Sequence, residues 1–171
     1  MTERRHPRIV NLNEVDARDT TKGKRFGAKI KPLGAAAGAR GVGASWYEVE
    51  PGRAAFPHHF HCANEEAIFV LEGGGTLRFG EERVDVRAGD WVTLPVGPAH
   101  AHQFINTGAT VLRYLCLSTM IPTEIAGYPD SKKVGALAAG SLEEARKGQH
   151  WVRFLARDGS SLDYYDGEET D

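Results

Sequence analysis

One stretch of the sequence indicates both the fold and the chemistry: Pro57-His58-His59-Phe60-His61-Cys62-Ala63-Asn64-Glu65-Glu66-Ala67-Ile68-Phe69-Val70-Leu71-Glu72-Gly73. Residues 67–71 form a continuous apolar run that ends at glycines, a pattern typical of a β-strand. His59 and His61 are two positions apart, so in an extended segment both imidazoles point to the same face. If the strand lies beside that segment, the carboxylate of Glu66 converges on the same point. Imidazole plus carboxylate is a ligand set for a borderline divalent metal.

A second histidine-containing window occupies residues 89–106. It reads as a turn, an apolar strand, a Pro/Gly loop, and a further strand that His100 and His102 enter. These two histidines share parity, so either of them, or both, could reach the metal. Five of the seven histidines lie in the two windows, whereas histidines placed for surface or core reasons would scatter. The clustering is the main evidence for a metal site.

Strand signals recur at short intervals, over residues 45–50, 54–60, 67–71, 76–79, 83–86, 90–94, 102–106 and 111–118, separated by Gly- and Pro-containing turns. This pattern predicts an all-β sandwich or barrel. A length of 171 residues suits one domain. We expect an N-terminal arm with edge strands (1–43), a barrel with the metal motifs (44–120), and a C-terminal wrap with a short helix and a terminal strand (121–171).

The flanking segments give weaker signals. Ile9–Leu12 is a short apolar run that could add an edge strand, and the Gly/Ala tract at 34–43 lacks the spacing of a phosphate-binding loop, so we predict a loop there. We expect residues 121–140 to wrap over the barrel surface. Ser141 and Glu144 predict a capping box that begins a short helix ending near Gly148, followed by a strand at 151–156.

Composition excludes several classes of function. A net charge of −2 with 26% charged residues supplies no basic field, so nucleic acid is not an expected partner. No apolar run reaches the length of a membrane span, and the first residues lack a signal-peptide core, so we expect a soluble cytoplasmic protein. The two cysteines are too few for a disulfide framework. Cys116 reads as a packed strand residue, and the parity of Cys62 turns it away from the histidines.

With these residues in place, the chain resembles the cupin superfamily over roughly residues 44–118. Five residues match the first cupin motif: Gly52, His59, His61, Glu66 and Gly73. The chain has one extra residue before the first histidine of the motif. The second motif is matched in two halves, the first by Gly89, Pro95, Gly97 and His100, and the second by His102 and Asn106. The loop between the halves is two residues longer than in the motif. The strand phrase that begins at His102 matches best, so the resemblance favours His102 as the fourth ligand, with His100 as the alternative.

The resemblance implies a double-stranded β-helix (jelly-roll) barrel with a metal held by His59, His61, Glu66 and His102. A divalent ion (Zn, Mn, Fe or Ni) in this set keeps one net positive charge and, if six-coordinate, two open positions for a bidentate small molecule. The family includes sugar-phosphate isomerases, and dioxygenases or decarboxylases of small organic acids and thiols. The resemblance therefore implies sugar-type isomerase or epimerase chemistry or dioxygenase-like chemistry. The alternative is non-catalytic binding or sensing of a small ligand. An enzyme would need a general acid or base near the metal, for which His100, Tyr114 and Glu72 are candidates.

We also expect a homodimer, because small open barrels leave apolar faces and strand edges that a second copy can cover. Two segments of the chain are candidates for exchange between the copies. One is the N-terminal arm and the other is the acidic tail that contains Tyr164 and Tyr165.

Overall fold

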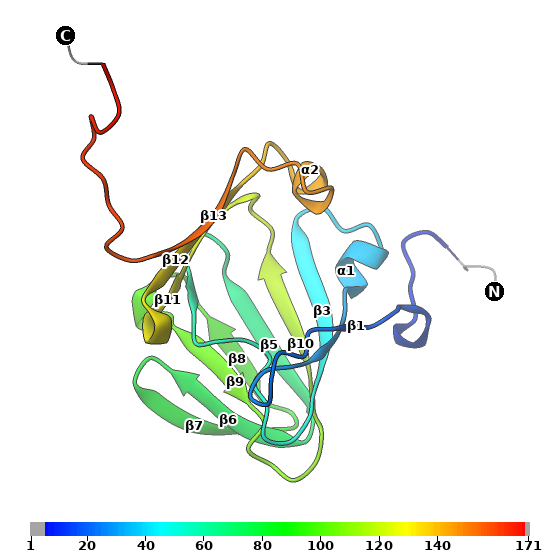
Figure 1. Ribbon diagram of the computed structural model, residues 1–171. Coiled ribbons are helices and arrows are strands. Elements are labelled where there is room, and N and C mark those ends of the chain that lie inside the picture. Colours follow the sequence, from blue (N-terminus) through cyan, green and yellow to red (C-terminus); the bar gives the residue numbers. More distant parts are fainter. Residues whose placement is uncertain (1–5, 170–171) are drawn as a thin grey trace.

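Three β-sheets enclose one hydrophobic core in the computed structural model, which describes residues 6–169 (Figure 1). The strand order of the six-stranded sheet is β1 (Arg18–Asp19), β2 (Lys29–Lys31), β3 (Val42–Val49), β10 (Leu112–Thr119), β5 (Glu66–Glu72) and β8 (Trp91–Leu94). The four-stranded sheet runs β13 (Val152–Arg157), β12 (Lys133–Ala138), β11 (Thr123–Tyr128) and β4 (Phe60–His61). The third sheet runs β7 (Glu82–Arg87), β6 (Gly74–Phe79) and β9 (His102–Ile105). The prediction of an all-β barrel is confirmed.

Helical structure is confined to short pieces: α1 (Leu33–Ala36), α2 (Leu142–Arg146), and 3-10 turns at Leu12–Glu14, Pro98–His100 and Pro129–Ser131. The short C-terminal helix was predicted, and Ser141 caps it by accepting a hydrogen bond from the Glu144 amide at 3.2 Å. The reciprocal bond of the predicted capping box is not formed within residues 6–169. No helix in that range is long and apolar enough to cross a membrane.

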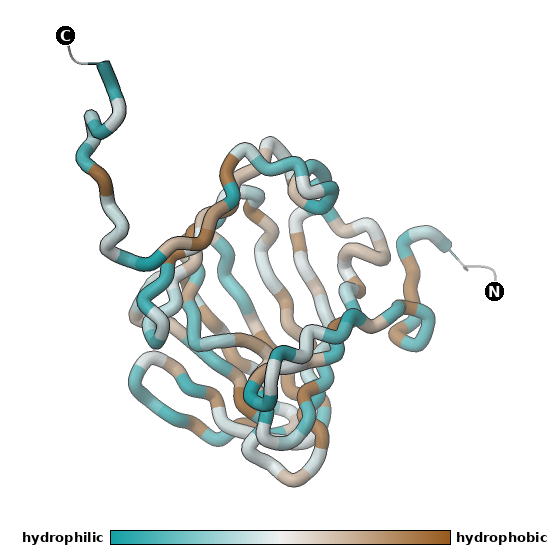
Figure 2. The backbone as a smooth tube through the Cα atoms, in the orientation of Figure 1, coloured by the Kyte–Doolittle hydropathy of each residue, from teal (hydrophilic) through white to brown (hydrophobic). Residues whose placement is uncertain are grey.

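The centre of the barrel is the pairing of β10 with β3 on one side and β5 on the other, which runs antiparallel over most of each strand. Alternate residues of β10 face inward, because strand side chains change sides at each position. Leu112 is fully buried in the core, while Tyr114 and Cys116 continue the same face into a cavity. Hydrophobic residues gather along the barrel strands and on the outlying β13 (Figure 2). The strand pattern thus supplies both the core and one wall of the cavity.

One expectation for the N-terminal part was wrong. Ile9–Leu12 forms no strand, because the Asn11 side chain accepts a hydrogen bond from the Asn13 N–H and Glu14 accepts one from the Asn11 N–H, which starts a 3-10 turn. The Gly/Ala tract, expected as a loop or loose turn between strands, opens with the one-turn helix α1, which packs on β3, and continues as a turn. The arm contributes β1 at the edge of the six-stranded sheet and β2 next to it.

Two further differences concern the segments on either side of the first motif and after the barrel. The predicted strand at 54–60 shrinks to β4, since Pro57 has no amide hydrogen to donate. Residues 123–138, expected as a surface wrap, form β11 and β12. β11 pairs with β4 through Ala126↔His61 and Gly127↔Phe60. This sheet therefore stands beside the histidine segment and takes part in the site.

Candidate metal centre

Three of the four predicted ligands lie on strands, and the fourth lies directly before one of these strands. His61 belongs to β4, Glu66 begins β5 and His102 begins β9, while His59 precedes β4. His59 and His102 are paired through their main chains, with N–H···O distances of 2.7 and 3.1 Å in the two directions. The backbone itself therefore holds the first histidine motif against the second.

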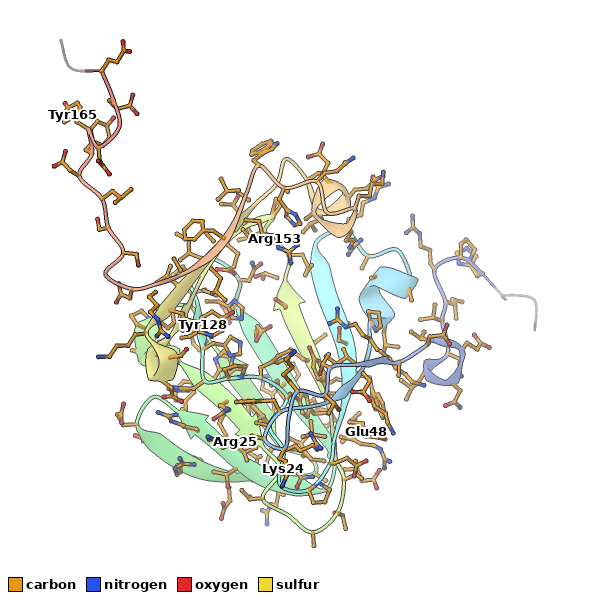
Figure 3. All side chains as sticks on the ribbon, in the orientation of Figure 1. Lys24, Arg25, Glu48, Tyr128, Arg153 and Tyr165 are labelled. Carbon is orange, nitrogen blue, oxygen red and sulfur yellow. The ribbon has the colours of Figure 1, made fainter. Side chains whose placement is uncertain are left out.

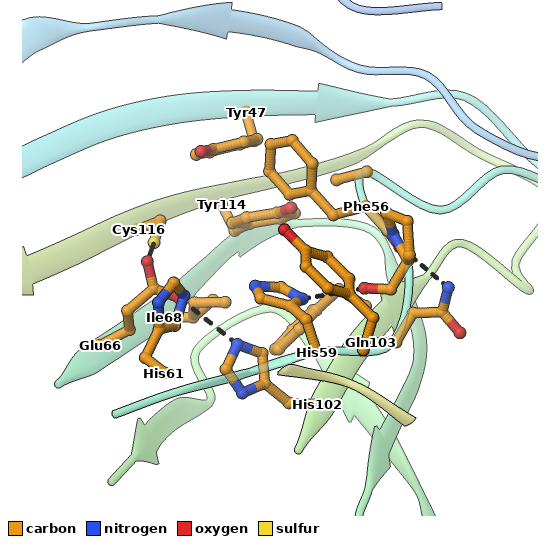
Figure 4. Close-up of a pocket in the computed structure, with 14 residues that line it drawn as sticks. Tyr47, Phe56, His59, His61, Glu66, Ile68, His102, Gln103, Tyr114 and Cys116 are labelled. Carbon is orange, nitrogen blue, oxygen red and sulfur yellow. Dashed lines mark hydrogen bonds and ion pairs between the residues drawn. The ribbon is translucent and has the colours of Figure 1, made fainter. Parts of the chain in front are cut away.

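The structure brings all four side chains together. One ligand atom from each of His59, His61, Glu66 and His102 lies within 4.8 Å of the others. The Glu66 Oε2 atom is 3.4 Å from His102 Nε2 and 3.7 Å from His61 Nε2. The rings of His59 and His102 have centroids 4.6 Å apart. Figure 4 shows the three imidazoles and the carboxylate facing one another inside the cavity.

Each imidazole has an acceptor next to Nδ1. His59 Nδ1 lies 2.8 Å from the Pro57 carbonyl, and His102 Nδ1 lies 3.0 Å from the His100 carbonyl. His61 Nδ1 lies 3.4 Å from a Glu124 oxygen, a close contact outside hydrogen-bond geometry. An acceptor at Nδ1 favours the proton there and leaves Nε2 as a lone pair for a metal. His102 Nε2 is indeed buried without a hydrogen-bond partner.

The electrostatics of the cluster favour the metal-binding protonation states. Burial, followed by the neighbouring His102 and His61, lowers the pKa of His59 from 6.5 to about 4. Burial alone would raise the pKa of Glu66, but the surrounding imidazoles outweigh it and hold that pKa below its usual value. At neutral pH, His59 is thus neutral and Glu66 is ionised. These are the forms that ligate a cation.

Glu124 was missed from the sequence, because residues 121–140 carried no strand assignment. Its carboxylate accepts hydrogen bonds from three successive amides, of Cys62, Ala63 and Asn64, at 2.9–3.0 Å, and from the Asn64 side chain at 2.6 Å. Burial alone would raise the pKa of Glu124, but these donors hold it below its usual value. Glu124 therefore fixes the loop between His61 and Glu66.

The other side chains considered from the sequence lie outside the cluster. His100 sits in the 3-10 turn and packs on Phe79, with ring centroids 5.6 Å apart. Glu72 is mostly exposed and pairs with Arg113 at 2.6 Å. Cys62 is exposed. His58, expected to face solvent or support the site, is buried 3.6 Å from Asp130.

A cavity of about 340 Å³ opens beside the cluster. Its walls include Gln103, Tyr114 and Cys116. The Cys116 thiol lies 3.7 Å from the Glu66 carboxylate. Its remaining walls are largely aromatic, with Tyr47 stacked on Tyr114 at a centroid distance of 4.9 Å and an interplanar angle of 7°. Burial raises the pKa of both tyrosines, so their hydroxyls stay protonated. A small molecule in this cavity would touch the histidine cluster directly.

Comparison with known proteins agrees with this architecture. Residues 45–118 match the family model described as Cupin domain. A sugar phosphate isomerase of the cupin superfamily from Silicibacter pomeroyi is similar in structure, with a TM-score of 0.74 and 25% identity over 91% of this chain and 97% of its own. A putative sugar phosphate isomerase from Acidithiobacillus ferrooxidans shares the fold, with a TM-score of 0.73 and 24% identity over 88% of this chain and 92% of its own.

An uncharacterised protein of Methanocaldococcus jannaschii is 35% identical over 60 residues, which are 35% of this chain and 46% of that relative. The match thus spans less than half of the relative's length. The two histidine segments and strands β4 to β9 fall within the matched range, and β3 and β10 fall mostly within it, whereas β1, β2 and β11 to β13 lie outside it. Residues 45–118 therefore form a cupin domain, and the barrel is a double-stranded β-helix.

Proposed function

We propose that His59, His61, Glu66 and His102 bind a divalent metal ion, which is Zn, Mn, Fe or Ni. The observation that carries this proposal is the convergence of four ligand atoms within 4.8 Å, with His102 Nε2 buried 3.4 Å from Glu66 Oε2 but without a hydrogen bond. Three nitrogen donors and one carboxylate form a set that borderline divalent metals favour. The Nδ1 contacts support the proposal, because they orient the rings as bound imidazoles are oriented.

We further propose that the protein acts on a small molecule in the adjoining cavity, by sugar-type isomerase or epimerase chemistry or by dioxygenase-like chemistry. The bound ion would supply Lewis acidity toward an oxygen of the substrate. The side chains have separate tasks: Glu66 offsets part of the positive charge, and the aromatic walls exclude water. The protonated hydroxyls of Tyr47 and Tyr114 offer neutral hydrogen-bond donors to the substrate. The similar protein from Silicibacter pomeroyi is called a sugar phosphate isomerase, which favours the isomerase branch, whereas the aromatic cavity walls without Lys or Arg favour the dioxygenase branch.

The test begins with the metal. Purified protein, stripped with a chelator and titrated calorimetrically with Zn(II), Mn(II), Fe(II) and Ni(II), should bind one ion per chain with at least one of them. Substitution of His102 by Ala should abolish stoichiometric binding. A native protein that binds none of the four ions would refute the proposal.

Activity then separates enzyme from binding module. The metal-loaded protein should turn over at least one member of a panel of keto-sugars, catechols and β-diketones. A loaded protein that turns over none of them, yet gains thermal stability from one, would favour non-catalytic binding or sensing of a small ligand.

A further inference from the structure

We propose that the cavity selects an uncharged, planar molecule with two oxygens that can chelate one ion, such as a catechol or an enolised β-diketone, and disfavours a phosphorylated sugar. This inference rests on the proposed metal site and names the substrate class for it. It arises from the shape and charge of the cavity walls.

The shape of the cavity suits a flat ring. Tyr47 and Tyr114 form one stacked pair, and Phe104 packs against Tyr114 with centroids 5.3 Å apart. Phe56 meets the Tyr47 ring edge-on at 6.0 Å. Aromatic walls gain most from ligands that present a π face or an apolar edge. Figure 4 shows the rings of Tyr47, Phe56 and Tyr114 on the same side of the cavity, facing the histidine cluster, and Phe104 lines the cavity as well. A ring bound there would place its substituents at the metal ligands.

The charge of the cavity points the same way. Glu66 is the one formally charged side chain among the described residues that line it, and neither lysine nor arginine is among them. A phosphate dianion is recognised by guanidinium, ammonium or clustered N–H groups, and beside a carboxylate it would be repelled. A divalent ion with Glu66 keeps one positive charge, which a singly ionised catechol or enol would neutralise. The complex would then bury no net charge, which avoids a large desolvation cost.

Two arginines could support the opposite conclusion. Arg146 lines a hollow of about 270 Å³ that shares Glu66 and Cys116 with the main cavity, and its guanidinium donates a hydrogen bond to the Ala39 carbonyl at 3.1 Å. Arg153 of β13 lines a separate hollow of about 220 Å³ with Glu124 and Tyr128. Tyr128 lines the main cavity too, so the two spaces adjoin. Figure 3 shows Arg153 and Tyr128 on the same side of the barrel. A phosphorylated substrate would have to extend past Tyr128 to reach this guanidinium. Substitutions of Arg153 and of Arg146 by Gln, made separately, therefore test the competing interpretation.

The experiment compares matched chelators on the Zn(II)-loaded protein. Affinities of catechol and catechol sulfonate are measured by calorimetry, and each is divided by the same ligand's affinity for free Zn(II). The ratio for catechol, which carries no sulfonate charge, should be at least about tenfold higher than the ratio for catechol sulfonate. This difference is equivalent to about 1.4 kcal/mol. Phe56 lines the cavity, and its substitution by Lys should reduce or reverse the difference between catechol and catechol sulfonate, because the ammonium group would attract the sulfonate. The same ratio should be higher for benzohydroxamate, which has an aromatic ring, than for acetohydroxamate, which has none. Phe104→Ala should reduce this difference.

Three outcomes would overturn the inference. Equal or tighter binding of the sulfonate by the native protein is the first. Equal binding of the two hydroxamates is the second. The third is binding of fructose phosphate that is much tighter than that of fructose and is lost in Arg153→Gln or in Arg146→Gln. In each case, stoichiometric Zn(II) binding would leave the proposed metal site standing, whereas failure to bind Zn(II) or any other of the four ions would remove both proposals.

Discussion

Glu124 Oε2 lies 3.4 Å from Nδ1 of His61, although the two residues are 63 positions apart in the sequence. β11 brings Glu124 there, and four hydrogen bonds from residues 62–64 fix its carboxylate. Among the three clustered histidines, His61 alone faces an ionised side chain at Nδ1; the other two face backbone carbonyls. The carboxylate should therefore orient the His61 ring and increase its basicity as a ligand.

We predict that Glu124→Gln lowers metal affinity about 10–100-fold, because a neutral amide orients His61 less strongly. Calorimetric titration of the stripped protein with Zn(II) measures the change. Glu143→Gln is the matched control, since Glu143 pairs with Lys147 on the surface of α2. Equal Zn(II) affinity in Glu124→Gln and the native protein would show that the contact has no role in binding.

A second prediction decides between the two histidines of the second motif. His102→Ala should weaken metal binding by more than about hundredfold, a larger loss than for a residue that only supports a ligand. His100→Ala should change it little, because His100 packs on Phe79 outside the cluster. Titration with Co(II), followed by the visible absorption of the bound ion, measures the metal affinity of both variants. A stronger effect of His100→Ala would reverse the assignment.

The third prediction concerns the pH dependence of the metal-free protein. His59 has a pKa of about 4 when folded, compared with 6.5 for a free imidazole. Between these values the unfolded chain binds a proton that the folded chain does not, so stability falls as the pH falls from about 6.5 to 4. The loss should approach 3 kcal/mol, about the value of the pKa difference. Urea unfolding of chelator-treated protein measures it, and His59→Gln should flatten the profile. An equally steep profile in that variant would assign the effect to other groups.

The fourth prediction tests the junction between β11 and β4. A methyl group added at Gly127 would fall on the Phe60 ring, and Gly127 is buried. Gly127→Ala should therefore destabilise the fold by about 1–3 kcal/mol, the usual cost of overpacking. Gly41→Ala, where nothing lies within 4 Å of the added carbon, is the control. Equal urea midpoints for the two variants would contradict the expected clash.

The fifth prediction concerns a second copy of the chain. β13 is the outer strand of its sheet and exposes Phe154 and Leu155 beside Arg153 and Arg157. Residues 158–169 extend away from the barrel and carry acidic and aromatic side chains, among them Tyr165 (Figures 1 and 3). Opposite charge and shared apolar character favour docking of this tail on β13 of another copy. We expect a homodimer by light scattering, and a monomer after truncation behind Arg157. A full-length monomer would refute the prediction.

The sequence allowed the barrel and the convergence of the four side chains to be predicted, because alternation and motif spacing are local signals. His59 and His61 share a face by parity alone, and the resemblance favoured His102 over His100; their role as ligands stays a prediction. Glu124 and β11 could not be found in this way. Their place depends on pairing with β4, a contact between distant segments that no local pattern encodes. At Ile9–Leu12 a local interaction was overlooked instead. The Asn11 side chain accepts a hydrogen bond from the Asn13 N–H, and this bond favours a turn over the strand that the apolar run predicted.

The mutual main-chain bonds between His59 and His102 have a consequence for how the protein matures. Peptide groups, which carry no charge and do not depend on any ion, already set the separation of these two residues. The proposed ion would therefore enter a site whose two histidine segments are already held together by the backbone. The identity of that ion would then reflect the supply at the moment of loading as much as the preference of the ligands.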